Sequence, residues 1–157
     1  MDDETSRPDE TASQRADRNW NELMQELRVM QTGTQVLAGF LLAVVFQPRF
    51  NELDAVQHGL YTVLVVLAAL ATILALAPVG MHRMLFHQHR KVMLVRVANR
   101  LVKADLIVVG ALTVGVVALI LDLTMSRPVA VTAAAVGLLV TVALWAVLPE
   151  LLRRRRG

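Results

Sequence analysis

A line of polar residues runs down the first long helix that the sequence predicts. Its members recur at spacings of three and four residues, so they share one helical face. Thr32 and Gln35 fall inside an apolar stretch, where contact with lipid is unfavourable for a polar side chain. We expect this polar stripe to face other helices or a wet cavity, either joining helices by hydrogen bonds or lining a polar pathway or ligand site. The polar stripe is Asn21, Gln25, Arg28, Thr32, Gln35 and Gly39, and a mostly apolar stripe beside it is Leu23, Leu27, Met30, Thr34, Leu37, Leu41 and Val44.

Two carboxylates border the third apolar stretch and are the groups that ion transport would need. Asp105 lies at the inner end of this stretch and Asp122 at its outer end. Proton-coupled carriers usually hold an ionisable group within the membrane, and neither residue is expected near the midplane. A local ion pair with Lys103 or Arg100 explains Asp105 simply. The alternative is a polar path through the membrane, lined by Thr32, Gln35 and Asp122, with Asp105 at its inner end.

The sequence offers little for other chemistry. It contains no cysteine, which excludes disulfides and thiolate metal sites. His82, His87 and His89 are spaced five and two residues apart, whereas ligands converge on a helix at spacings of three or four. They are interpreted as interfacial histidines, with a pH-sensing role left open. No nucleophile–base set or phosphate loop is visible, so we expect no enzyme, metal or cofactor.

Four apolar stretches must position these residues. Each is long enough to cross the hydrocarbon core of a bilayer, and in lipid the backbone must satisfy its own hydrogen bonds, which favours helices. The predicted fold class is therefore all-α: a polytopic membrane protein with four transmembrane helices in a bundle. We expect Pro48 to end the first helix, and Pro78 with Gly80 to end the second. The predicted domains are a disordered acidic tail (1–16), a transmembrane domain (17–152) with spans at about 29–46, 60–78, 104–123 and 129–148, and a basic tail (153–157).

The distribution of cationic residues predicts the orientation. Of the 16 Lys and Arg residues, only Arg49 and Arg127 lie in the two segments that four spans place on one side. Loops rich in Lys and Arg stay in the cytoplasm, so we expect a plasma-membrane protein with both termini and the central loop inside. Aromatic residues collect at the predicted boundaries, as is typical of membrane interfaces, and only Phe40 lies well within a span.

The central basic stretch, residues 81–103, is predicted to be mostly helical. It could lie on the membrane surface with its cations against anionic lipid, or extend the second and third spans into the cytoplasm. Nucleic acid is not an expected partner, because topology already explains the charge and no aromatic stacking platform accompanies it.

Several short motifs resemble a family of small four-span bacterial membrane proteins of unknown function. They occur at 18–23, 25–29, 31–33, 46–50, 77–78, 82–83 and 98–101. The similarity covers roughly residues 17–148 and implies the four-span architecture. Some members carry the label "sodium:proton antiporter", but this sequence has no carboxylate at the predicted midplane.

The resemblance also suggests a cluster at the cytoplasmic membrane face. Charged and amide side chains from three helices crowd at one predicted depth, where they could join the helices or bind a cytosolic or headgroup ligand. The predicted cluster is Glu26, Arg28, Gln31, His82, Arg83, Asn99, Arg100 and Asp105.

Three functions follow from these patterns. The first is a non-enzymatic structural or regulatory role, or a role as a subunit, with a homo-oligomer or another membrane protein as partner. The second is a small oligomeric secondary transporter of the sodium:proton antiporter type. The third is a membrane protein that binds anionic lipids.

The orientation can be tested with a reporter that is active only outside the cell. We expect no activity when it is fused within residues 81–103, because the cations there hold this segment in the cytoplasm. The same reporter fused beside Arg127 is the matched control and should be active. Activity from the first fusion would contradict the four-span arrangement.

Overall fold

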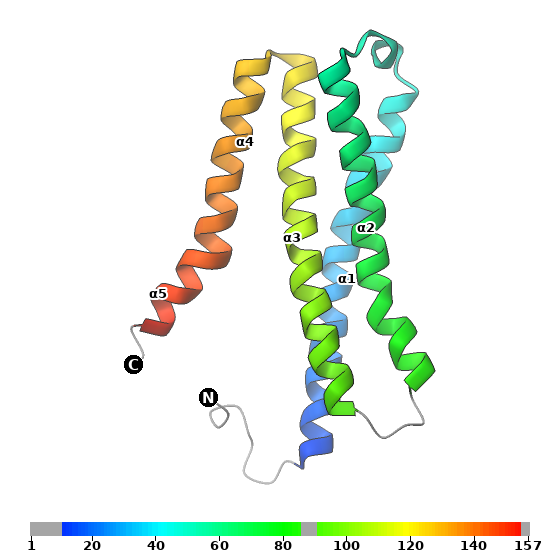
Figure 1. Cartoon of the computed structure of the whole chain (residues 1–157), viewed down its shortest axis with the longest axis vertical. Helices are drawn as coiled ribbons and strands as arrows, with labels where there is room; N and C mark the ends of the chain where they lie inside the picture. Colours follow the sequence, from blue (N-terminus) through cyan, green and yellow to red (C-terminus); the bar gives the residue numbers. More distant parts are fainter. Residues whose placement is uncertain (1–10, 86–90, 155–157) are drawn as a thin grey trace.

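Four long helices run side by side in the computed structural model, which describes residues 11–85 and 91–154 (Figure 1). Each is long and apolar enough to cross a membrane, which confirms the all-α fold and the four transmembrane helices. The helices are α1 (Ala12–Val45), α2 (Ala55–Leu85), α3 (Lys91–Thr124) and α4 (Arg127–Val142). A 3-10 turn, η1 (Pro48–Glu52), links α1 to α2, and α4 continues through a π-helical turn, η2 (Ala143–Val147), into α5 (Leu148–Arg154).

The two ends of the molecule differ in what they carry. The turn η1 and the connection between α3 and α4 lie at one end, here called the η1 end (Figure 1). The beginning of α1, the end of α2, the beginning of α3 and helix α5 lie toward the other, here called the basic end because Arg83, Arg96 and Arg100 are exposed there. Alternation of the chain between two ends is what four membrane crossings require.

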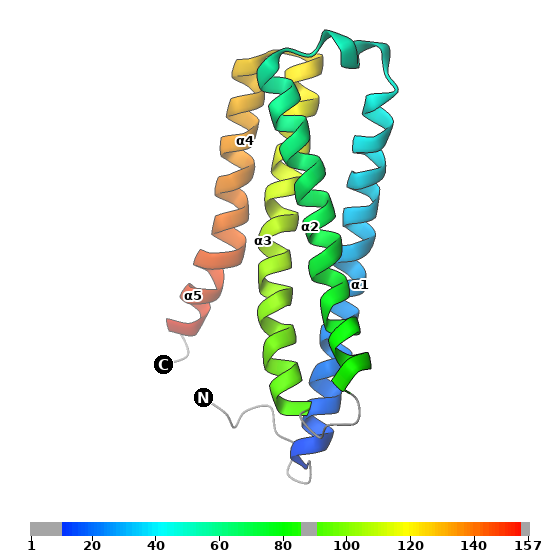
Figure 2. The same ribbon diagram turned by 45° about the vertical axis from the view of Figure 1, so that its right-hand side comes forward.

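Helix packing is uneven. Helices α1, α2 and α3 contact one another, whereas α4 packs against α3 and leans away from it toward α5 (Figure 2). One hydrophobic cluster, around Leu41, Leu64 and Leu112, fills the half nearer η1. A second cluster, around Leu27 and Ala98, fills the half nearer the basic end. The core therefore belongs to the first three helices, with α4 at their side.

Two aromatic contacts fix how α1 and α2 align. Near the η1 end, the Tyr61 hydroxyl donates to the Leu41 carbonyl at 3.2 Å. Toward the basic end, the Trp20 and His82 rings stack with their centroids 4.7 Å apart. The spacing between Trp20 and Leu41 on α1 equals the spacing between Tyr61 and His82 on α2. The two antiparallel helices therefore keep one register over their whole shared length.

Several predicted helix ends are wrong. Helix α2 does not end at Pro78 but continues to Leu85. Proline is tolerated within membrane helices, because neighbouring helices and local adjustments satisfy the backbone groups that it frees. The predicted tail is too long, since α1 begins at Ala12 with a capping box between Thr11 and Gln14. The fourth helix passes its predicted end and includes Pro149.

A π turn precedes Pro149. A proline ring crowds the carbonyl four residues earlier, here that of Trp145, and its own N–H is missing. In η2 the Leu148 N–H bonds instead to the Ala143 carbonyl, five residues back. The wider turn is the usual form of such an insertion in an α-helix, and it lets the helix continue.

The structure also decides between the two arrangements of residues 81–103. The part up to Leu85 extends α2, and the part from Lys91 opens α3, so both are extensions of transmembrane helices. His87 and His89 lie outside the described residues.

Glycine permits close contact between α2 and α3. A β-carbon at Gly115 would overlap the side chain of Leu64, which is fully buried. At Gly33, by contrast, a β-carbon would meet nothing within 4 Å. Small residues commonly allow close approach of this kind in membrane bundles.

We expect Gly115→Ala to destabilise the protein by about 1–3 kcal/mol, because Leu64 has no free space to move into. The change can be measured as a fall in the melting temperature of the protein in mild detergent. Gly33→Ala is the matched control and should leave that temperature unchanged or raise it. Equal effects of the two variants would contradict the packing of Gly115 against Leu64.

Candidate functional site

The residues of the predicted cytoplasmic cluster do not form one network in the structure. Glu26 and Asn99 come together in a groove between α1 and α3. His82 lies on α2 and stacks against Trp20. Gln31 is half-buried, whereas Arg28, Arg83 and Arg100 are exposed. The eighth member, Asp105, is buried.

The groove has a volume of about 290 Å³ and is partly polar. Some of its lining residues were not predicted, because the groove exists only where α1 packs against α3. Its lining is Asn19, Glu22, Leu23, Glu26, Val95, Arg96 and Asn99. The mixture of carboxylates, amides and one guanidinium can hydrogen-bond a small polar molecule but specifies no class of ligand.

Asp105 is the most unusual polar residue of the bundle. Only 1% of it is exposed, and its Oδ1 has no hydrogen-bond partner. The expected ion pair with Lys103 or Arg100 is absent from the described part of the chain, and both cations are exposed. The reason is helical geometry: neither cation is three or four residues from Asp105, so neither shares its face.

The depth of Asp105 in the membrane follows from its position along α3. The rise along α3 puts it about 25 Å from Asp122 at the η1 end. A hydrocarbon core of about 30 Å therefore places Asp105 close to the other boundary. It lies between the two hydrophobic clusters of the core, and Thr34 is the other buried polar residue among those described.

The second carboxylate, Asp122, belongs to a clamp that joins three segments at the η1 end. Its Oδ2 accepts hydrogen bonds from Gln57 Nε2 at 3.1 Å and from Arg127 Nη2 at 3.2 Å. Arg127 also pairs with Asp54, just before α2. With partners from α2 and α4, Asp122 is fully accounted for as a structural residue.

Asp54 holds two roles in this clamp. Its Oδ1 accepts the backbone N–H groups of Val56 and Gln57 and so caps α2. The Gln57 N–H and, next, the Arg127 guanidinium hold the pKa of Asp54 below its ordinary value of 3.8. The carboxylate is therefore ionised at neutral pH and available to Arg127. Asp54 and Arg127 were not predicted, although opposite charges on two short loops of one side were a usable signal.

The polar stripe of α1 faces away from the bundle, against our expectation. Thr32 and Gln35 are exposed, whereas Leu23, Leu27 and Leu41 of the apolar stripe are buried. Within one chain, Thr32, Gln35 and Asp122 therefore do not line a common path. Thr34, the one polar member of the apolar stripe, is buried with it.

The burial of Asp105 leads to a prediction about stability. Asp105→Leu should stabilise the protein by roughly 1–3 kcal/mol, because it removes a buried polar group that lacks a partner. The measurement is the melting temperature in mild detergent, with the exposed Glu26→Leu as control, which should change stability little. Loss of stability in Asp105→Leu alone would mean that the carboxyl has a stabilising partner in the folded protein.

Comparison with known proteins gives a family and no function. No curated protein and no solved structure matches the chain. A model described as "Family of unknown function (DUF6328)" matches residues 9–149, which include the first three transmembrane helices and most of the fourth. The chain therefore belongs to the DUF6328 family of unknown function, as its resemblance to small four-span membrane proteins implied.

Proposed function

We propose that the protein is a non-enzymatic subunit that self-associates in the plasma membrane through the outward face of α1. The N-terminus, the connection between α2 and α3 and the C-terminus would lie in the cytoplasm. The observation that carries this proposal is the position of Gln35, which is exposed and has no hydrogen-bond partner in the described chain.

Gln35 lies at the depth of the bilayer midplane. The helical rise puts it about 15 Å from the end of α1 at Val45, which is half of a hydrocarbon core of about 30 Å. Lipid chains offer no hydrogen bonds there. A primary amide without a partner is therefore unfavourable, and covering it with another helix is favoured.

A second copy of α1 is a suitable cover. A primary amide both donates and accepts hydrogen bonds, so Gln35 of two copies can satisfy each other across a two-fold axis. One turn away, a β-carbon at Gly39 would meet nothing within 4 Å. The absence of a side chain there lets two helices approach closely.

The other outward-facing polar residue of this region needs no partner. The Thr32 hydroxyl donates to the Arg28 carbonyl of its own helix at 2.9 Å. Arg28 marks the point where α1 leaves the apolar region, and its charge favours a cytoplasmic position for that end. The requirement for a partner is thus concentrated at Gln35.

The two other functions have less support. Buried Asp105 favours a transporter, but the polar residues proposed for a path are not brought together in one chain. The exposed cations Arg83, Arg96 and Arg100 favour contact with anionic headgroups at the basic end. Such contact is compatible with self-association and would hold the assembly against the inner leaflet.

We expect Gln35→Leu to weaken self-association in a bilayer by about three- to thirtyfold, the range that corresponds to hydrogen bonds between membrane helices. The measurement is energy transfer between labelled copies at graded protein-to-lipid ratios. Thr132→Val is the matched control, since the Thr132 hydroxyl donates to the Pro128 carbonyl of its own helix. A monomeric wild type, or equal association of the two variants, would disprove the proposal.

A further inference from the structure

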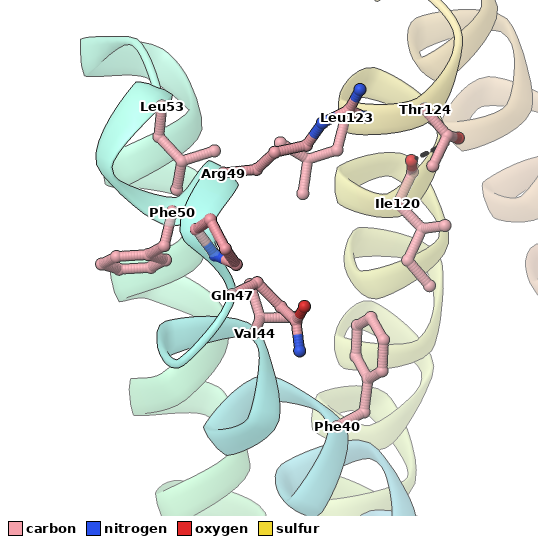
Figure 3. A pocket seen from close by; sticks show the side chains of 10 residues that line it. Phe40, Val44, Gln47, Arg49, Phe50, Leu53, Ile120, Leu123 and Thr124 are labelled. Carbon is pink, nitrogen blue, oxygen red and sulfur yellow. Dashed lines mark hydrogen bonds between the residues drawn. The ribbon is translucent and has the colours of Figure 1, made fainter.

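A second feature of the η1 end is not used by the proposed assembly. A pocket of about 360 Å³ opens between α1 and α3, beneath the segment that contains η1 (Figure 3). Its lining comes from the end of α1, the connection to α2 and the end of α3. The residues are Phe40, Val44, Gln47, Pro48, Arg49, Phe50, Leu53, Ile120, Leu123 and Thr124.

The pocket is charged at one end only. Phe40 lies on α1 and is the lining residue furthest from the η1 segment, whereas Ile120 lies on α3 nearer the end of that helix (Figure 3). The Gln47 amide lies near the level of the Phe40 ring, and Arg49 extends from the η1 segment toward Leu123 (Figure 3). Arg49, the one charged residue of the lining, therefore lies at the η1 end of the pocket, where the headgroup of a lipid would lie.

Arg49 is not neutralised within the described chain. The η1 end carries a second cation, Arg127, and that one pairs with Asp54 and Asp122. No ion pair joins Arg49 to any residue that the structure describes, and its side chain is exposed. A guanidinium beside an apolar pocket is complementary to an anion that is attached to a hydrocarbon chain.

We propose that this pocket binds one anionic phospholipid of the leaflet on the η1 side. One acyl chain lies between α1 and α3 against Phe40, Val44 and Ile120. The phosphate group accepts hydrogen bonds from Arg49. The site is on a different face of α1 from Gln35, so lipid binding and self-association do not compete for residues.

Binding can be measured by native mass spectrometry of the full chain in mild detergent. The probes are phosphatidylglycerol and phosphatidylcholine with identical acyl chains. We expect the wild type to retain phosphatidylglycerol more strongly, and Arg49→Gln to lower its affinity by about tenfold, as the loss of a charge-assisted hydrogen bond implies. Arg153→Gln removes an equal charge from the exposed end of α5 and should leave that affinity unchanged.

A second measurement locates the acyl chain without relying on a mutated pocket. A phosphatidylglycerol with a photoreactive group midway along one chain should label peptides that contain Phe40 or Ile120. Equal retention by Arg49→Gln and Arg153→Gln, equal binding of the two lipids, or labelling only of other helices would overturn the proposal. If Arg49→Gln instead lowered dimerisation without changing lipid retention, a second copy rather than a lipid would cover the pocket.

Discussion

Hydrocarbon offers no hydrogen bonds, so each polar group within the membrane must find its partner in protein. This constraint explains most polar side chains of the bundle. Thr32, Thr113 and Thr132 each donate to the carbonyl four residues earlier in their own helix. Asp122 accepts from Gln57 and Arg127. Asp105 in the core and Gln35 on the outside carry larger polar groups that have no hydrogen-bond partner within the described chain, and these residues are therefore informative about what the single chain lacks.

The outward position of Gln35 follows from the part of α1 that lies beyond the membrane. Near the basic end this helix is amphipathic, with Leu23 and Leu27 buried and Asn21 and Arg28 exposed. The hydrophobic effect fixes that rotation about the helix axis, because water is present there. A continuous helix has only one rotation, so the same stripes continue into the membrane and carry Gln35 outward. The membrane part of α1 does not oppose this rotation, because an apolar helix face is about equally stable against lipid and against another helix.

The sequence was sufficient for the architecture and insufficient for the contacts. Apolar length and the distribution of charge predicted four helices and the grouping of their ends, because both are local properties of the chain. Composition could not show that α2 continues past Pro78 or that a π turn precedes Pro149. Both depend on which hydrogen bonds the backbone groups near each proline make. The sequence also predicted an ion pair for Asp105 that the described residues do not form, because the contacts of α3 with α1 and α2 determine which of its faces is buried. It used Arg49, Arg127 and Phe40 only for topology and span boundaries, and did not predict the clamp or the pocket to which they belong.

The lateral order of the helices explains why assembly should use α1 rather than α4. Both have outward faces, but α4 packs mainly against α3 and exposes mainly aliphatic residues, and its threonines Thr132 and Thr141 bond to carbonyls of their own helix. Lipid solvates such a surface without loss, so α4 needs no cover. The outward face of α1 carries an amide at the midplane, which lipid cannot satisfy. The amide of Gln35 thus gives α1 a stronger requirement for a protein partner than α4 has.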